Sequence, residues 1–245
     1  MIKGIYHSAA GMLPRLTQQE IVANNLANVN TTGFKGSRRF FRRVLDNTLI
    51  QQGMHGEPGM LTELEESMFT NFTEGALKET RNPLDLAIHG DGFFVLQTGE
   101  DEDQVSYTRN GNFSLNAEGE LVNGRDYRVM GEGGTIRITG QEVVIQSDGS
   151  VVVDGEIVDT LKIVDFEQPY KLLRNGYGYF TPVGSAEGDT PEKVDIKQGF
   201  LENSNVVAVL EMVRMIELNR NYESCQKAIL AQDETLRKAV NDIAK

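Results

Sequence analysis

The sequence predicts an α+β protein in which the N- and C-terminal helices pair as a coiled coil and an irregular all-β domain is inserted between them. Apolar residues recur at alternating spacings of three and four at both ends of the chain, the heptad pattern of helices that pack along one stripe. The middle holds short apolar runs separated by turn dipeptides, which is typical of short strands. The predicted boundaries are 1–34 for the N-terminal helix, 35–81 for an extended arm, 82–197 for the β-rich domain and 198–245 for the C-terminal helix.

The first helix is predicted from a stripe with one polar member, made of Ile2, Ile5, Ala9, Met12, Leu16, Gln19, Ala23 and Leu26. Pro14 lies inside this stretch, and because proline removes a backbone donor we expect it to kink or restart the helix. The stop is predicted near Gly33. We expect the side chains of Asn24, Asn25 and Asn28 to cap helix ends and bond neighbouring backbones, and a purely local loop is the alternative.

Residues 35–81 fit no regular element. They contain Gly53, Gly56, Pro58 and Gly59, followed by an acidic amphipathic stretch. We expect an extended arm with a short hairpin or helix, which becomes ordered only against another part of the assembly.

Turn signals separate short apolar runs between residues 82 and 197. The strongest hairpin signal is Asn110-Gly111, which predicts that residues 105–109 pair with residues 113–115. Further turns are predicted at Glu118-Gly119, Asn123-Gly124, Asp148-Gly149 and Asp154-Gly155. This pattern favours a small, irregular β-sandwich or barrel over βαβ units.

The last helix is expected to begin near residue 203, with Asn203 or Ser204 as its N-cap. Its predicted stripe consists of Met215, Leu218, Tyr222, Cys225, Ile229, Gln232, Leu236, Ala239 and Ile243. Residues 206–218 are apolar on almost every side. Because one intramolecular partner covers a single stripe, self-association explains this stretch better than internal burial does.

Composition excludes several classes of protein. The chain has 245 residues, with 24 Lys and Arg against 36 Asp and Glu, and the net charge of −12 argues against nucleic acid as the main partner. One cysteine excludes an internal disulfide and a Cys-cluster zinc site. No apolar run is long enough to span a bilayer, and residues 1–13 lack the core of a signal peptide. We therefore expect neither membrane insertion nor a cleaved signal.

The charge is divided unevenly. Residues 1–43 carry seven cations and one acid, a net charge of +6, whereas the remainder carries 17 cations and 35 acids, a net charge of −18. A solvated basic face is one explanation. The other is attraction between copies, in which acidic β-domain surface of a neighbour contacts the basic run Lys35, Arg38, Arg39, Arg42 and Arg43.

No catalytic constellation is evident. His7, His55 and His89 lack partners at metal-ligand spacing, so we interpret them as surface or turn residues. The four acids at 100–103 lack the glycine and bidentate glutamate of an EF-hand loop. Cys225 lies on the heptad stripe as a small core residue. The sequence thus predicts no enzyme, no metal site and no cofactor.

Three parts of the chain resemble, in order, the signatures of the bacterial flagellar rod and hook protein family. The first is ANNLANVNTTGFK at 23–35. The second is RNPLDLAI at 81–88 with GDGFFV at 90–95 and YTRNG at 107–111, similar to the family's first β-domain. The third is QGFLENSNV at 198–206, followed by Glu211, Met212, Met215, Ile216, Arg220, Tyr222 and Glu223. The length resembles the rod proteins, and residues 129–134 and 161–166 favour the proximal rod type, with the distal type and a hook-like axial subunit as alternatives.

The resemblance implies a non-enzymatic subunit of the basal-body rod, which polymerises through its terminal helices and transmits torque from motor to hook. Implied partners are copies of itself, other rod subunits, the export apparatus and the surrounding ring proteins. The implied location is the periplasmic rod, reached without a cleaved signal. The residues expected to form the helical core of the assembly are Ile2, Ile5, Met12, Leu16, Asn24, Asn25, Leu26, Asn28, Val206, Leu210, Val213, Leu218, Tyr222, Cys225, Ile229 and Leu236.

Two functions of other classes stay open from the sequence. One is a peptidoglycan-binding or peptidoglycan-active β-domain on helical stalks, which paired carboxylates in a cleft would support. The other is a soluble signalling coiled coil with a β sensor, which a helical dimer in dilute solution would support.

Overall fold

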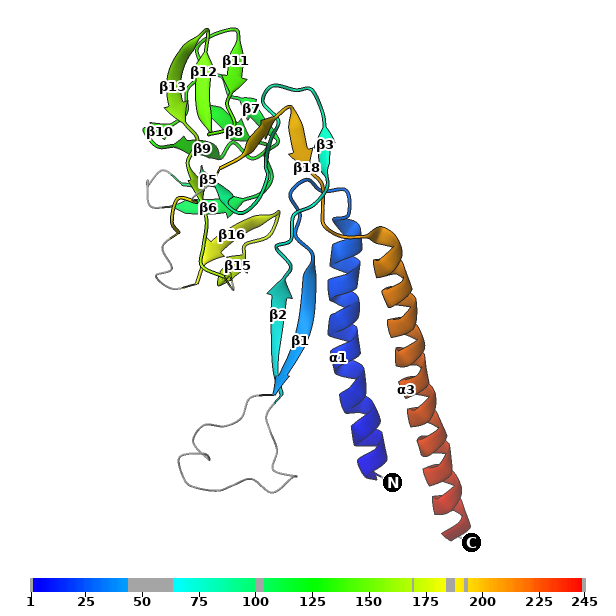
Figure 1. The fold of residues 1–245 in the computed structure, drawn as a ribbon. Coiled ribbons are helices and arrows are strands. Elements are labelled where there is room, and N and C mark those ends of the chain that lie inside the picture. Colours follow the sequence, from blue (N-terminus) through cyan, green and yellow to red (C-terminus); the bar gives the residue numbers. More distant parts are fainter. Residues whose placement is uncertain are drawn as a thin grey trace, which may run out of the picture. The chain divides into compact units, whose positions relative to one another are not determined.

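The computed structural model describes residues 2–43, 64–99, 104–168, 170–183, 188–191 and 194–243. In these ranges the chain is mostly strands with two helices, α1 (Ile2–Ala27) and α3 (Ala208–Ile243), as the α+β class predicts (Figure 1). The chain divides into two compact units. The helical unit consists of Met1–Ala27, Gly36–Asn71 and Val207–Lys245, and the β unit of Asn28–Lys35 and Phe72–Val206. The chain therefore passes between the units four times.

In the helical unit, α1 and α3 lie side by side and run in opposite directions (Figure 1). Gln19 Nε2 donates a hydrogen bond of 2.7 Å to Asn219 Oδ1 between them. The members of the predicted α3 stripe between Met215 and Leu236 are partly buried, among mostly exposed neighbours. Those side chains therefore face α1.

The buried face of α1 differs from the predicted stripe. Ile21, Val22 and Asn25 are buried, whereas Leu16 and Ala23 are exposed. The reason is that β1 (Ser37–Arg43) packs on α1 in addition to α3, so the helix is covered from two sides. The pattern of one stripe can predict only one of these contacts.

α1 runs as one helix through Pro14 and is not restarted there. The helix ends at Ala27, before the predicted stop, and Gly33 lies outside it with a φ of 65°. Arg39 Nη1 of β1 donates to the carbonyl of Pro14 at 2.6 Å, which ties the strand to this part of the helix.

α3 begins at Ala208, so Asn203 and Ser204 are not its N-cap. Both residues belong to the β unit, where the Asn203 amide donates to Ala76 O at 2.9 Å. Ser204 Oγ accepts from the Val206 amide at 3.2 Å, in a local turn before the helix. The β unit thus holds the chain up to Val206, which delays the start of the helix.

β1 pairs with β2 (Leu64–Thr70) in an antiparallel ladder from Ser37–Thr70 to Arg43–Leu64. Both strands lie within residues 35–81, the predicted extended arm. The glycine-rich residues 53–59 and His55 lie outside the described residues.

The β unit contains short strands whose described pairs are antiparallel. They are β3 (Leu77–Glu79), β4 (Leu86–Ile88), β5 (Phe93–Gln97), β6 (Val105–Thr108), β7 (Phe113–Leu115), β8 (Leu121–Asn123), β9 (Arg128–Gly131), β10 (Gly134–Thr135), β11 (Val143–Ile145), β12 (Ser150–Val153), β13 (Glu156–Thr160), β14 (Ile163–Val164), β15 (Leu172–Arg174), β16 (Tyr179–Pro182), β17 (Ile196–Gln198) and β18 (Phe200–Glu202). The largest sheet has the order β15-β16-β6-β5-β9-β8-β7, with β14 beside β5 and β10 beside β9. Separate sheets are formed by β11-β12-β13, by β17-β4 and by β18-β3.

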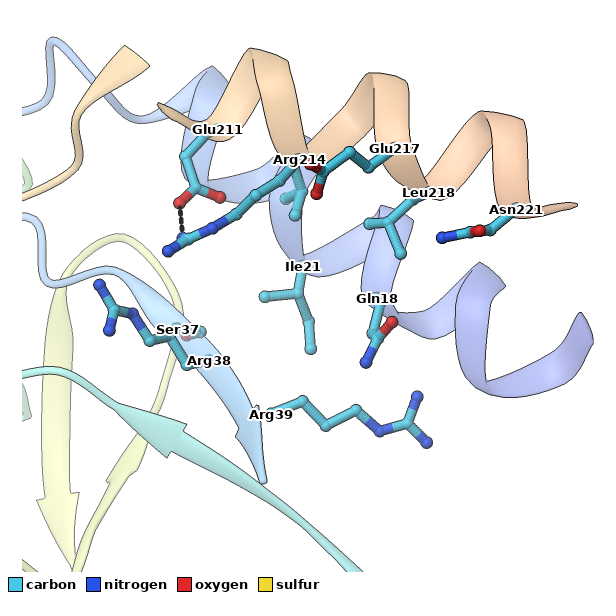
Figure 2. Close-up of a pocket in the computed structure, with 11 residues that line it drawn as sticks. Gln18, Ile21, Ser37, Arg38, Arg39, Glu211, Arg214, Glu217, Leu218 and Asn221 are labelled. Atoms are coloured by element: carbon cyan, nitrogen blue, oxygen red, sulfur yellow. Dashed lines mark hydrogen bonds and ion pairs between the residues drawn. The ribbon is translucent and has the colours of Figure 1, made fainter. Parts of the chain in front are cut away.

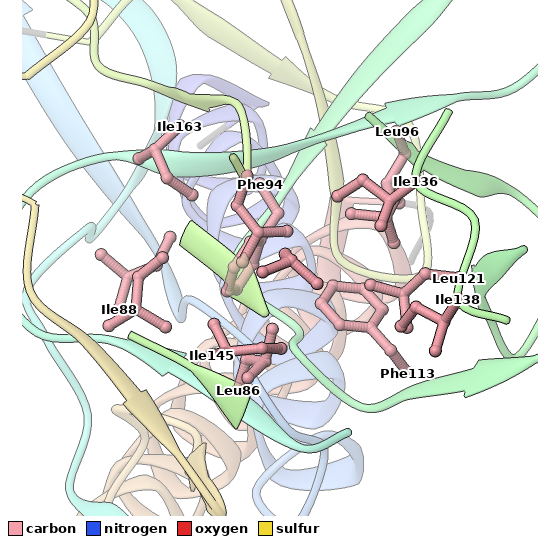
Figure 3. Close-up of a cluster of buried hydrophobic side chains, with 14 of the residues drawn as sticks. Leu86, Ile88, Phe94, Leu96, Phe113, Leu121, Ile136, Ile138, Ile145 and Ile163 are labelled. Carbon is pink, nitrogen blue, oxygen red and sulfur yellow. The ribbon is translucent and has the colours of Figure 1, made fainter. Parts of the chain in front are cut away.

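The main core of the β unit lies between these sheets. Figure 3 shows aliphatic and aromatic side chains from several strands converging on one another, among them Leu86, Phe94, Phe113 and Leu121, all at most 3% exposed. A second buried cluster contains Phe93, Val95, Val164, Phe166 and Phe180. Because β5 contributes alternate residues to both clusters, it is the central strand of the unit.

The hairpin predicted at Asn110-Gly111 does not form. β6 pairs with β5 and β16, whereas β7 pairs with β8. The chain instead passes close to β4, where Leu86 N donates to Gly111 O at 3.0 Å and a Cβ on Gly111 would lie 1.8 Å from Leu86 O. The glycine is thus needed for a close crossing of backbones. The turn at Asp154-Gly155 is confirmed, with φ of 50° and 92° between β12 and β13.

Candidate assembly surface

The first turns of α3 expose a row of large apolar side chains. Leu210 is 55% exposed, and the α3 apolar surface, as we call this set, consists of Val207, Val209, Leu210, Met212, Val213 and Ile216, each close to half exposed or more. Single exposed apolar residues are ordinary on protein surfaces, but six within ten residues of one helix mark an interaction surface.

The geometry of the helix explains the exposure. Glu211 is buried (5%), and Ala208, Arg214, Met215 and Leu218 are partly buried. With about 3.6 residues per turn these positions share one side of α3. The five members of the α3 apolar surface that lie in the helix occupy the rest of the circumference, and Val207 directly precedes the helix. No other described part of the helical unit covers this surface. A chain that exposes this much apolar surface has further burial to gain from a partner.

A cleft of about 290 Å³ lies beside this surface, between α1, α3 and β1 (Figure 2). Ile21, Val22 and Leu218 give it apolar walls. Figure 2 shows the guanidinium groups of Arg38 and Arg39 on the β1 side and that of Arg214 on the α3 side. The cleft is therefore apolar within and largely basic at its edges.

Charged groups inside the helical unit are balanced locally. Arg214 Nη1 donates to Glu211 Oε1, and Glu211 Oε2 accepts from Asn25 Nδ2 at 3.3 Å. Burial lowers the pKa of Arg39 below its ordinary value, although a guanidinium keeps its proton at neutral pH. Arg38 is exposed at the β1 edge of the cleft (Figure 2).

The structure distributes the predicted helical-core residues over several environments. On α3, Leu210 and Val213 lie on the α3 apolar surface. The partly buried members that face α1 are Leu218, Tyr222, Cys225, Ile229 and Leu236. The first set is thus exposed to solvent, and the second is covered within the helical unit.

On α1, Met12 and Leu26 are partly buried, Leu16 and Asn24 are exposed, and Asn25 is buried. Ile2 and Ile5 lie in the helix, but the environment of their side chains is outside the described part. Asn28 and Val206 belong to the β unit and are partly buried there.

Lys35 differs from the other members of the basic run. Its side chain is fully buried in the β unit, where Nζ donates to Glu202 Oε1 at 2.6 Å and to Thr73 O at 2.9 Å. Burial lowers its pKa from the ordinary value of 10.5. It is therefore not available to a neighbouring copy, and the prediction for this residue is wrong. Arg42 and Arg43 lie in β1, with side chains outside the described part.

Sequence reasoning missed two features of these sites. The apolar run at 206–218 predicted self-association, but the residues named for the helical core omit four of its exposed members, Val207, Val209, Met212 and Ile216. Sequence reasoning also missed the pair between Lys35 and Glu202, which are 167 residues apart and share no local pattern.

The described residues contain no group of three or more His, Cys, Asp or Glu that could hold a metal ion. Neither described helix combines the length and hydropathy needed to cross a membrane.

Comparison with known families matches all three parts of the chain. The model described as "Flagella basal body rod protein" matches residues 5–35, that of the "Flagellar hook protein FlgE/F/G D1 domain" matches 87–153, and that of the "Flagellar basal body rod FlgEFG protein C-terminal" matches 197–242.

Individual relatives match over nearly their whole length. The flagellar basal-body rod protein FlgG of Bacillus subtilis is 34% identical over 98% of this chain and 99% of its own. FlgF of Caulobacter vibrioides is 31% identical over 100% and 99%, and FlgG of Agrobacterium fabrum is 33% identical over 93% and 94%. The fold and these matches define a structural protein of the bacterial flagellum. The chain belongs to the flagellar basal-body rod protein family. The matches do not favour the glycan-directed or the signalling alternative.

Proposed function

We propose that this chain is a structural subunit of the flagellar basal-body rod that polymerises through α1 and α3. The observation that carries the proposal is the α3 apolar surface. Full burial of a Val, Leu, Ile or Met side chain contributes about 1.5–3 kcal/mol, so covering six half-exposed ones is a substantial driving force. A second copy with its own unsatisfied helix face is the partner that a polymer supplies.

The two helices pair as a coiled coil inside each subunit, and the all-β insert lies between them in sequence. The partly buried α3 stripe and the Gln19–Asn219 hydrogen bond support this pairing. The domain boundaries at 34, 81 and 197 remain a proposal from the sequence, whereas the compact units divide after residues 27, 35, 71 and 206. One face of α3 then packs against α1 of the same subunit, and the α3 apolar surface contacts neighbouring subunits.

A contact between different surfaces of like subunits does not close on itself, so it propagates as a helical array. In such an array torque is resisted by many close-packed helices, each of which contributes a small energy in a dense interior. We therefore assign the chain a mechanical role, transmitting torque from motor to hook, and no enzymatic one.

The remaining parts of the proposal follow from family membership. The subunit is exported through the flagellar export apparatus without a cleaved signal and assembles in the periplasm, within reach of the surrounding ring proteins. The proximal rod position stays our prediction from the sequence, since relatives named FlgG and FlgF match at similar identity.

Polymerisation is tested with Leu210→Glu and Val213→Glu together. We expect wild-type protein to form sedimenting polymers on concentration and the double variant to stay monomeric. Both side chains are about half exposed, so the subunit itself should fold, with unchanged circular dichroism. Leu173→Glu is the matched control, because Leu173 is 59% exposed on β15 of the β unit. Polymerisation of the double variant at the wild-type concentration would refute the proposal.

We propose a second contact between subunits, in which the basic run of one copy meets acidic β-domain surface of the next. Lys35 is no longer part of this contact because it is buried. Arg38, Arg39, Arg42 and Arg43 lie on β1, and the rest of the chain beyond residue 43 carries a net charge of −18. We expect reversal of all four to Glu to raise the concentration needed for polymerisation and to remove its salt dependence. Normal polymerisation of this variant at low salt would end the idea.

A further inference from the structure

Three segments that are distant in sequence meet in the β unit, namely residues 28–35, 72–76 and 199–206. Backbone hydrogen bonds join them: Gly33 N donates to Glu202 O at 2.7 Å, and Asn205 N donates to Phe34 O at 3.3 Å. Each of the four passages of the chain between the two units occurs at an end of one of these segments. We call this meeting point the junction.

One buried ion pair contacts all three segments of the junction. Lys35 Nζ lies 2.6 Å from Glu202 Oε1 and donates to Thr73 O at 2.9 Å. The same Glu202 oxygen accepts from Gly75 N at 2.7 Å. Both charged side chains are at most 1% exposed. The pair thus connects the chain that follows α1, the chain that follows β2 and the chain that precedes α3.

Two arginines attach the junction to the strands of the β unit. Arg109 Nη1 lies 3.7 Å from Glu202 Oε2, and its guanidinium donates to Ile88 O at 3.3 Å and to Gly90 O at 2.7 Å. Arg174 of β15 donates to Lys35 O, and its guanidinium lies 4.6 Å from the centre of the Phe34 ring. The junction is therefore tied to β4 and β15.

Stability alone is a weak explanation for such a pair, because well-packed apolar residues in the same volume serve a core equally well or better. This pair is also incompletely satisfied, since among the described residues Glu202 Oε2 has no hydrogen-bond partner. Its position is more informative than its energy, because it lies where both helix-bearing ends of the chain join the β unit.

We propose that the Lys35–Glu202 pair is a positioning device for the terminal helices. Residues 28–35 follow α1, and residues 199–206 precede α3. The ion pair holds these two segments together, so the helices are already close to each other before they pair. The two residues are 167 positions apart in sequence. In a folded β unit the β4–β17 pair still joins residues 86 and 198, so without the ion pair the path between the two segments is about 50 residues long. Because the probability of loop closure falls with about the 3/2 power of loop length, shortening this path to about ten residues raises the effective concentration of one helix for the other by up to roughly tenfold.

The test measures how often the two helices meet within a dilute monomer of the full chain. The protein has one cysteine, Cys225 in α3, and Met12→Cys adds one in α1, where the antiparallel run set by Gln19 and Asn219 brings residue 12 towards residue 225. We expect Lys35→Met and Glu202→Gln to slow intramolecular disulfide formation with oxidised glutathione about three- to tenfold. Lys197→Met is the control, because it removes a lysine from an exposed ion pair of the same unit, with Asp195 at 3.0 Å.

Hydrogen exchange on the same samples separates positioning from unfolding. Amides of β4 and β5 should keep their protection in both variants, whereas residues 28–35 and 199–206 should exchange faster. If Lys35→Met also loses protection in β5, that variant has unfolded and only Glu202→Gln tests the proposal. Its side-chain oxygen can still accept the hydrogen bond from Gly75 N. A variant with protected β5 amides and an unchanged disulfide rate overturns the proposal. The measurement uses monomers, so its outcome is independent of whether the chain polymerises.

Discussion

The side-chain amide of Asn25 and the backbone of Ser37 exchange two hydrogen bonds, each of 2.9 Å. Asn25 Nδ2 donates to Ser37 O, and Asn25 Oδ1 accepts from Ser37 N. The amide thus pairs with the first residue of β1 as a neighbouring strand would. Since Nδ2 also reaches Glu211 of α3, one side chain that is 3% exposed connects α1, β1 and α3 within the helical unit.

Removing this amide should loosen the helical unit. Asn25→Ala removes both of these hydrogen bonds from the partly buried backbone of Ser37, and we expect it to cost about 1–3 kcal/mol. Asn25→Asp keeps the acceptor but loses the donor and puts a carboxylate beside Glu211, so it should be no better. The measurement is urea unfolding followed by helical circular dichroism. Equal midpoints for wild type and both variants would show that the amide contributes nothing.

Two glycines of the β unit should not tolerate alanine. Gly33 has a φ of 65°, and a Cβ there would lie 2.4 Å from Asn110 N, while a Cβ on Gly75 would lie 1.9 Å from Asn203 O. We expect Gly33→Ala and Gly75→Ala to destabilise the unit by about 2–4 kcal/mol, because backbone must move in each case. Thermal unfolding followed by tyrosine fluorescence measures this.

Gly124→Ala is the matched control for these two substitutions. No described heavy atom lies within 4 Å of a Cβ at Gly124, and its φ is not positive. We expect its unfolding temperature to stay within error of wild type or to rise slightly. If all three variants lost a similar amount of thermal stability, the destabilisation would not come from the close approach of backbone atoms to the new Cβ.

The β unit should lose stability in acid through Glu120. Its carboxylate accepts from Arg128 Nε at 2.9 Å, Asn116 Nδ2 at 3.1 Å and Arg137 Nη2 at 3.1 Å, and these hydrogen bonds lower its pKa below the ordinary value of 4.5. A lowered folded-state pKa stabilises the fold above 4.5, and this contribution is lost as the pH falls through the folded value.

Both arginines are about half exposed, so the contribution is limited to about 1 kcal/mol. We expect the fall in unfolding temperature between pH 7 and pH 3 to be smaller in Glu120→Gln than in wild type. The exposed Glu118→Gln should keep the wild-type pH dependence. Parallel curves for wild type and Glu120→Gln would contradict the assignment.

The helices illustrate what the sequence could predict. A repeat of 3.6 residues per turn determines which side chains share a face, so the α3 stripe from Met215 to Leu236 could be read directly. The buried face of α1 could not, because Ile21 and Val22 are covered by β1, whose place depends on contacts remote in sequence. Neither could the continuity of α1 through Pro14, where Arg39 adds a hydrogen bond from another element.

The β unit shows the same limit for strand pairing. Asn110-Gly111 has the residues of a two-residue turn, but Gly111 is used for a close crossing with Leu86 instead. Local preference could not distinguish the two uses of one glycine. Likewise Lys35 resembled its basic neighbours, and only the fold reveals that Glu202 buries it. The apolar run at the start of α3 could be predicted because apolar density is a local property, and the junction could not because it joins distant segments.

The junction also defines where a protease should stop in the isolated monomer. In the monomer the α1–α3 pair lacks the cover that neighbouring subunits supply, so it should open often, and cutting should remove about the first 30 and the last 40 residues. Within the β unit, Thr32 Oγ1 donates to Asn110 Oδ1 at 2.8 Å and Asn205 Nδ2 donates to Thr73 O at 2.9 Å, so both ends of the remaining chain are held close to residues 28 and 206. We expect the mass of the resistant fragments to place their outer ends near these two residues. Digestion of the assembled polymer is the control, in which α1 and α3 should survive because neighbours cover them. Fragments of the monomer that retain α3 as far as Leu236 would show instead that the helix pair is stable before assembly.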